Sequence, residues 1–197
     1  FVSAAGHELS TPLAILRGEL ELAGKPGRSA EELAAAVSEA AVETDHLIRL
    51  AQDLLLLSRD DEGAIVVMPV GQDIVPVVER IREAFATRAA DKHVQLVVET
   101  PATLWATVDD VRLRQMVDNL VDNALRFAPS ESTILVRLRE EASTVTIEVS
   151  DEGPGFPPAF LPRAFERFSR PDESRDRDHG GTGLGLAIVK TLAEAHH

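Results

Sequence analysis

Apolar positions in the first third of the chain form two helical stretches separated by a turn. In the first stretch they recur three or four residues apart, at Leu9, Leu13, Leu16 and Leu20. In the second they alternate spacings of four and three, at Leu33, Val37, Ala40, Thr44, Leu47, Ala51 and Leu54. Each spacing gives one apolar stripe along an α-helix, and Gly24-Lys25-Pro26-Gly27 between them is a turn signal. The pattern predicts a helical hairpin over residues 1 to 62.

Two local signals refine these helices. Ser29 is the expected N-cap of the second helix, because Glu32 three residues later completes a capping box. Pro12 has no N–H to donate to the carbonyl of Glu8, so we expect a kink in the first helix.

The apolar stripes also predict the oligomeric state of the hairpin. Each helix of an isolated two-helix hairpin has only one neighbour, which is too little to bury such a stripe, whereas a second copy completes a four-helix bundle. Homodimerisation is therefore predicted. The alternative is that the hairpin packs against the rest of its own chain.

The pattern changes near Gly63 from helical spacing to short runs rich in β-branched residues, which indicates a domain boundary. Helices are predicted at 73–90, 109–128 and 183–195, and strands at 94–99, 103–108, 132–139 and 143–150. A polar stretch rich in Gly and Pro, residues 151–182, precedes the last helix. This mixture predicts a two-layer α+β sandwich with one functional loop.

Composition excludes several classes of protein. The chain has 197 residues with 20 Lys and Arg against 33 Asp and Glu, a net charge of −13, which argues against a general nucleic-acid binder. Cysteine is absent, which excludes disulfides, thiolate catalysis and Cys-ligated zinc. No apolar run reaches the roughly 18 residues of a membrane span, so we expect a soluble chain, although it can be cut from an anchored protein.

One helical segment carries candidate chemistry. Asn119 and Asn123 lie four residues apart on one helix face, and Arg126 lies about one turn further on. An amide oxygen can ligate Mg²⁺, and an arginine can contact phosphate. Taken alone, such a pair of asparagines is more often a surface feature.

Two glycine-rich segments complete the candidate site. Asp151-Glu152-Gly153-Pro154-Gly155-Phe156 directly follows a predicted strand, where glycines permit a sharp turn and close approach of a ligand. Gly180-Gly181-Thr182-Gly183-Leu184-Gly185-Leu186 precedes the last helix, whose N–H groups favour an anion. Singly, they would be a plain turn and a flexible linker. Other phosphate motifs fail, because Pro26 follows Gly24-Lys25 where a Walker loop needs Ser or Thr, and GxGxG is not the dinucleotide fingerprint.

His7 is the candidate nucleophile of the hairpin. It lies two residues before Leu9, about 200° around the helix from the apolar stripe, so its imidazole is expected to face solvent. A neutral imidazole is a competent nucleophile, and the adjacent Glu8 can orient it. Thr11 lies one turn away on the same side.

Together these segments resemble the catalytic core of a sensor histidine kinase of two-component systems. HELSTPL resembles the phosphoacceptor box, NLVDNALRF the N box, DEGPGF and GGTGLGLAIVK the two glycine boxes, and FERF the F box. The five motifs occur in family order. The resemblance implies a dimerisation and phosphotransfer hairpin, 1–62, followed by a C-terminally truncated Bergerat-type ATP-binding domain, 63–197.

The resemblance also implies roles for individual residues. The catalytic residues would be His7, Glu8, Thr11 and Arg170. The nucleotide site would comprise Asn119, Asn123, Arg126, Phe127, Asp151, Gly153, Gly155, Gly181, Thr182, Gly183, Leu184 and Gly185. Within it, Asn123 would ligate Mg²⁺, Asp151 would accept from the adenine amino group of ATP, and the glycines would shape the pocket and both ends of a lid over it.

The implied reaction is ATP-dependent autophosphorylation of His7, followed by transfer to an aspartate on the receiver domain of a response regulator. Thr11 implies an additional phosphatase activity toward that regulator. The expected location is the cytoplasmic part of a bacterial sensor, anchored through a region absent from this chain. Two alternatives stay open: a catalytically inactive dimeric adaptor, which Gly6 in place of the family's usual Ser keeps open, and an ATPase of the gyrase type that does not phosphorylate histidine.

Overall fold

The computed structural model describes residues 2–61, 63–142, 144–171 and 181–196. Within this range the chain forms two compact units, Phe1–Ala64 and Ile65–His197. None of the described helices combines the length and apolarity that crossing a membrane requires.

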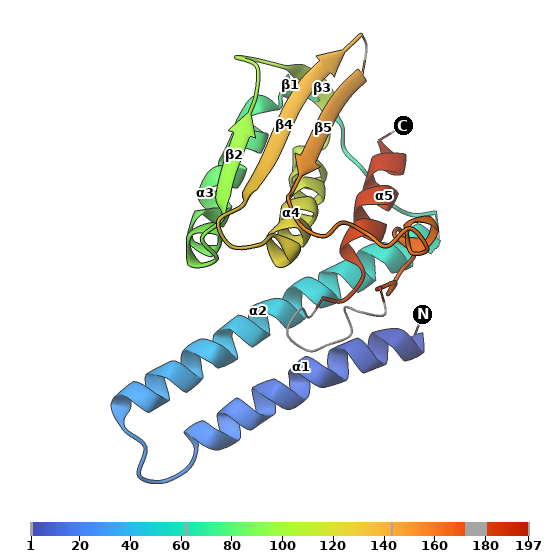
Figure 1. The fold of residues 1–197 in the computed structure, drawn as a ribbon. Coiled ribbons are helices and arrows are strands. Elements are labelled where there is room, and N and C mark those ends of the chain that lie inside the picture. Colours follow the sequence, from blue (N-terminus) through green and yellow to red (C-terminus); the bar gives the residue numbers. More distant parts are fainter. Residues whose placement is uncertain (1, 62, 143, 172–180, 197) are drawn as a thin grey trace. The chain divides into compact units, whose positions relative to one another are not determined.

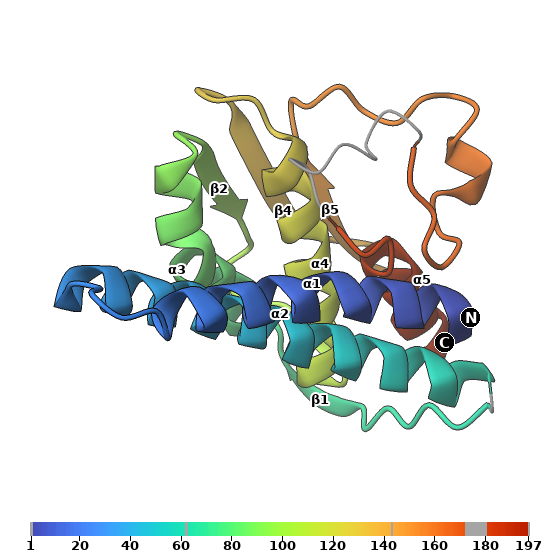
Figure 2. The ribbon, with the colours of Figure 1, turned by 90° about the horizontal axis from the view of Figure 1, so that it is seen from below.

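The first unit is the predicted helical hairpin. Helix α1 spans Val2–Ala23 and helix α2 spans Ala30–Asp61, and the two lie side by side and antiparallel (Figures 1 and 2). The capping box is confirmed, because the Glu32 N–H donates to Ser29 Oγ at 3.1 Å and the Ser29 N–H donates to Glu32 Oε2 at 2.9 Å. Helix α1 continues through Pro12.

The apolar stripe predicted for α2 is only partly buried. Ala40 is buried, but Leu33 and Val37 are 39% and 60% exposed. Helix α1 likewise leaves Leu13 and Leu20 52% and 55% exposed. Contact between the two helices thus covers one side of each helix and leaves exposed apolar residues elsewhere on the described part of the hairpin.

Within the described residues, the second unit contains three α-helices and five strands. The helices are α3 (Val75–Asp91), α4 (Asp110–Phe127) and α5 (Gly185–Ala195). The strands are β1 (Val70–Asp73), β2 (Gln95–Glu99), β3 (Trp105–Val108), β4 (Thr133–Glu141) and β5 (Thr144–Ser150). A single turn of 3₁₀ helix, η1 (Leu161–Arg163), lies in the predicted polar loop.

The strands form a mixed sheet and a separate two-stranded ribbon. In the sheet, of order β2-β4-β5, β2 is parallel to β4 and β4 is antiparallel to β5. Helices α3 and α4 pack against one face of this sheet and α5 packs on α4 (Figure 1), which confirms the two-layer α+β sandwich. Alternate residues of β4 point into the core, with Ile134, Val136 and Leu138 buried.

The ribbon was not predicted. Strand β1 pairs antiparallel with β3, with Val70 opposite Val108. Its four residues, VGQD, include a single apolar residue, so neither alternation nor β-propensity marks them. This strand exists because β3 supplies a partner, which is a long-range effect.

Candidate functional site

The end of α4 presents the predicted polar residues. Its apolar residues Leu113, Val117, Val121 and Ala124 are buried, which turns the opposite face of the helix away from the core. The Asn119 Nδ2 donates to the Gln115 carbonyl at 2.9 Å, so its amide oxygen is directed elsewhere. Within the described residues the Asn123 side chain makes no hydrogen bond. These are the only two asparagines in the chain, and both offer an amide oxygen to a ligand.

The second glycine segment lies directly against these side chains. A Cβ added at Gly185 would lie 2.9 Å from Asn119 Oδ1, and one added at Gly181 would overlap the Arg126 guanidinium. Only residues without a side chain allow this approach. The structure therefore joins segments that are 55 or more residues apart in the sequence into one surface, with amide oxygens, an arginine and bare backbone side by side.

The first glycine segment also lies against the end of α4. Asp151, directly after β5, is exposed, and its Oδ1 accepts from the Gly153 N–H at 2.8 Å, which orients the carboxylate. A Cβ at Gly153 would lie 3.0 Å from the Phe127 carbonyl oxygen, so the segment packs closely on the last turn of α4. Gly155 has φ +68° and no atom within 4 Å of an added Cβ, so it borders open space.

Arg126 is the centre of positive charge in this site. Burial lowers the pKa of its guanidinium, and the positive charges of Arg170 and Arg88 lower it further, while Asp122 opposes the change. Arg170, predicted from its place after FERF, is thus within electrostatic reach of Arg126. Anionic ligand charge would relieve the repulsion between the arginines, which is the environment that a polyphosphate requires.

The remaining predicted residues of the glycine segment have structural roles. The Thr182 Oγ1 accepts from the Leu184 N–H at 3.4 Å. The Leu184 side chain is fully buried, so any ligand contact by this residue is through its backbone. Gly180, which the motif includes, lies outside the described residues.

Gly183 gives a stability prediction with a matched control. It has φ +68°, and an added Cβ would lie 2.8 Å from the Phe168 carbonyl carbon, where neither backbone can yield easily. We expect Gly183→Ala to lower the free energy of unfolding by about 2–3 kcal/mol. Gly155 has the same φ, but an added Cβ there would meet open space. Gly155→Ala should therefore lower the free energy of unfolding by only about 1 kcal/mol. Chemical denaturation followed by circular dichroism measures both, and equal losses would contradict the packing argument.

The hairpin unit carries three of the predicted catalytic residues, His7, Glu8 and Thr11. His7 and Thr11 are both exposed on α1, and Glu8 is half-buried. Within the described residues no hydrogen bond or ion pair links His7 to Glu8, which is consistent with adjacent positions on a helix pointing about 100° apart. The expectation that His7 faces solvent is thus confirmed.

Two residues near the site escaped the sequence analysis. Lys92, at the end of α3, donates from Nζ to the Leu125 carbonyl at 2.8 Å and to the Arg126 carbonyl at 3.1 Å. Arg88, one turn earlier, donates to Asp122 at 2.6 Å. Basic residues at the end of a predicted helix are the only local signal, and they do not reveal partners more than thirty residues away.

Comparison with known proteins gives two family matches. Residues 1–63 match the His Kinase A (phospho-acceptor) domain, and residues 108–197 match the family described as histidine kinase-, DNA gyrase B- and HSP90-like ATPase. The whole chain is 37% identical to the signal transduction histidine-protein kinase BaeS of Escherichia coli, but spans only 42% of that protein.

The solved structures similar to this chain include two sensor kinases. The mycobacterial sensor histidine kinase MprB is 32% identical, covering 66% of this chain and 80% of its own, with a TM-score of 0.55. ShkA, solved in complex with AMPPNP, is 28% identical over 96% of this chain and 41% of its own, with a TM-score of 0.69.

Proposed function

The chain belongs to the histidine kinases, and we propose that it phosphorylates itself on His7 with ATP and passes the phosphoryl group to an aspartate of a response regulator. One observation carries the proposal: Gly181 and Gly185 bring bare backbone against Arg126 and Asn119. This arrangement combines the amide, cationic and N–H donor groups that phosphates and a bound Mg²⁺ require.

The residues present fit a Mg²⁺-bound nucleotide. Asp151, held by the Gly153 N–H, would accept from an exocyclic amine, and Arg126 and Arg170 would contact phosphates. Asn123 would be the protein ligand of Mg²⁺. The described residues contain no group of three or more His, Cys, Asp or Glu able to hold a metal, and Mg²⁺ in phosphoryl-transfer sites takes few protein ligands and several oxygens from phosphate and water. The binding of AMPPNP by ShkA supports this assignment.

His7 performs the chemistry of the hairpin in this proposal. ATP supplies the γ-phosphoryl group. A ring nitrogen of neutral His7 attacks the phosphorus in line, an N–P bond forms, the bond from phosphorus to the bridging oxygen breaks, and ADP leaves with that electron pair. The imidazole proton passes to Glu8 or to solvent. Exposure of His7 makes it accessible to both donor and acceptor of the phosphoryl group.

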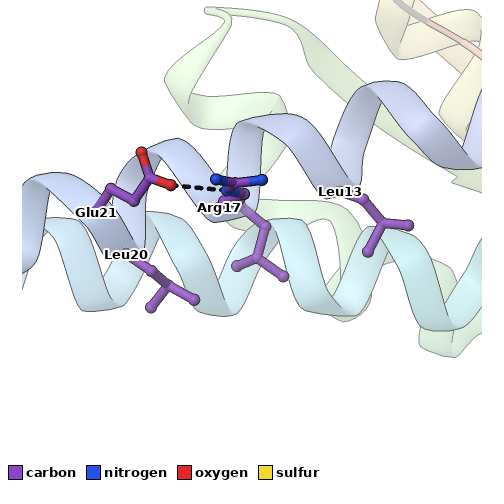
Figure 3. A pocket seen from close by; sticks show the side chains of 5 residues that line it. Leu13, Arg17, Leu20 and Glu21 are labelled. Carbon is purple, nitrogen blue, oxygen red and sulfur yellow. Dashed lines mark hydrogen bonds and ion pairs between the residues drawn. The ribbon is translucent and has the colours of Figure 1, made fainter.

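Dimerisation through the hairpin is part of the proposal. An apolar surface runs along α1, lined by Leu13, Leu16 and Leu20 and bordered by an ion pair between Arg17 and Glu21 (Figure 3). Burying such a stripe against a second copy would remove apolar area from water and complete a four-helix bundle. The receiver domain of the regulator would dock on the same hairpin, where its aspartate can reach His7.

We place this chain in the cytoplasmic part of a membrane-anchored sensor. It spans about two fifths of the length of BaeS, and ATP and response regulators are cytoplasmic. The sensing and anchoring segments would lie in the portion of such proteins that this chain does not match.

A labelling assay tests the proposal. The chain is incubated with γ-labelled ATP and Mg²⁺, and the protein is tested for label that is labile to acid and stable to alkali, as expected of a phosphohistidine. Such label supports the kinase. Tight ATP binding without label would instead indicate an inactive adaptor, and released phosphate without label would indicate an ATPase.

Thr11 gives a prediction about the reverse reaction. We propose that Thr11 positions water for hydrolysis of the phosphorylated regulator, because it is exposed one turn from His7 on the same helix. Thr11→Ala should reduce hydrolysis of the phospho-regulator about tenfold or more while keeping autophosphorylation within about twofold. The release of phosphate from a purified phospho-regulator measures the first rate. Equal loss of both activities would contradict a specific role.

A further inference from the structure

The last turns of α3 hold the last turns of α4 through two basic side chains. Lys92 donates to the carbonyls of Leu125 and Arg126, the two residues that precede the last residue of α4. Arg88, four residues before Lys92, donates from Nη2 to Asp122 Oδ1 at 2.6 Å. Since Asn123, Arg126 and Phe127 lie in this part of α4, contacts from α3 fix the segment that carries the candidate phosphate-binding groups.

The Arg88 guanidinium is held in place although its side chain is 56% exposed. Its Cζ lies 5.3 Å from the centroid of the Phe85 ring, and Phe85 is buried in the core of this unit. A cation over a fixed aromatic face loses little further freedom when it pairs with a carboxylate. Arg88 is therefore a better-ordered partner for Asp122 than an ordinary surface arginine.

Asp122 divides its two oxygens between two arginines. While Oδ1 accepts from Arg88, Oδ2 accepts from Arg126 Nη2 at 3.1 Å. On its other side the Arg126 guanidinium lies against the bare backbone of Gly181. The chain Arg88, Asp122, Arg126 thus fixes where the Arg126 guanidinium sits relative to the glycine segment.

The charges of this chain matter as much as its geometry. A carboxylate paired with Arg126 alone would neutralise that arginine, leaving a net charge of about zero where a phosphate has to bind. With Arg88 on the other oxygen, the three groups sum to +1. Arg88 therefore orients Asp122 and also reduces the extent to which Asp122 neutralises the charge of Arg126.

We propose that Arg88 is a positioning residue for nucleotide phosphate, acting through Asp122 on Arg126. This inference rests on the proposed function, because it assumes that Arg126 faces a polyphosphate. It adds a residue of α3, outside all five motifs and outside the matched residues 108–197, to the determinants of nucleotide affinity.

The test compares affinity for ATP with affinity for adenosine, using calorimetric competition on the full chain with Mg²⁺ present. In Arg88→Gln, ATP should bind about tenfold more weakly while adenosine changes by less than about twofold, because only phosphate contacts are affected. Arg80→Gln is the matched control, because it removes the same charge from α3 at a side chain whose one partner among the described residues is the Pro76 carbonyl of its own helix. This control should leave both affinities unchanged.

Two further measurements distinguish positioning from a general structural effect. Arg88→Lys keeps the charge and should recover part of the ATP affinity. In autophosphorylation, Arg88→Gln should raise KM for ATP more than it lowers kcat. In an Asp122→Asn background, adding Arg88→Gln should cause no further loss, because the connection is already broken.

The outcomes are separable. If the unaltered chain binds neither ATP nor its analogues, the proposed function fails. If it binds ATP but Arg88→Gln behaves as Arg80→Gln does, the positioning role is overturned. Equal weakening of ATP and adenosine in Arg88→Gln also overturns it, because that result indicates loss of fold. Full additivity with Asp122→Asn would show that Arg88 does not act through Asp122.

Discussion

Replacing His7 with Gln is expected to abolish the acid-labile label that γ-labelled ATP leaves on the chain, with no measurable residual. The glutamine side chain keeps polarity and approximate length but has no nitrogen able to attack phosphorus under these conditions. Because His7 is exposed on α1 and makes no hydrogen bond or ion pair within the described residues, the change should not affect the hairpin. Affinity for ATP should stay within about twofold, since the nucleotide residues belong to the other unit.

His46→Gln is the matched control for this experiment. His46 lies on α2, where its Nδ1 is 3.4 Å from Glu43 Oε1, and it has no part in the proposed transfer. It should keep full labelling. Label that persists in His7→Gln would assign the phosphorylated residue elsewhere, and equal loss in both variants would indicate a damaged hairpin.

Replacing Asn123 with Ala is expected to reduce autophosphorylation by about a hundredfold or more, because loss of a metal ligand removes several kcal/mol of charge stabilisation in the transition state. In this structure the Asn123 amide is half-exposed and makes no hydrogen bond within the described residues, so truncation breaks no internal contact. Alanine is also the best helix former, so α4 should persist. The characteristic result is that ATP affinity loses its dependence on Mg²⁺ concentration, which calorimetric titration at several Mg²⁺ concentrations measures.

Gln115→Ala is the corresponding control on the same helix. It removes an amide two turns earlier, where Gln115 Oε1 accepts from Arg112 and the Gln115 carbonyl still accepts from Asn119. Labelling and Mg²⁺ dependence should both be retained. If Asn123→Ala bound MgATP as well as the unaltered chain did, Asn123 would not be the metal ligand.

Most of the secondary structure could be predicted from local pattern. The pattern predicted the hairpin over residues 1–62, and it predicted α3, α4 and α5 to within two residues at each end. The capping box of Ser29 and Glu32 was recognisable from residue type and spacing. These features depend on residues three or four apart, so the chain encodes them locally. Strand β1 could not be found in this way, because four mostly polar residues become a strand only through pairing with β3.

The candidate site likewise has features that the sequence predicted and contacts that only the structure revealed. The sequence indicated which residue types belong to it, and the spacing of Asn119 and Asn123 placed both on one helix face. It did not indicate that Arg126 lies against Gly181, that Gly183 lies against Phe168, or that Asp122 connects Arg126 to Arg88. Arg126 and Gly181, Gly183 and Phe168, and Asp122 and Arg88 are 15 to 55 residues apart, so these three contacts depend on how the helices and loops pack.

The sequence by itself determined the two helices of the hairpin, the exposed His7, the glycine segments and the polar face of α4. Helix periodicity and backbone freedom depend on neighbouring residues, so a local pattern is enough to predict these features. Only the tertiary structure decided the parallel pairing of β2 with β4, the partial exposure of the α2 stripe and the three-residue ion-pair chain that ends on Arg126. Closing long loops costs entropy that many weak contacts must offset together, so no single stretch of sequence reveals which distant groups meet.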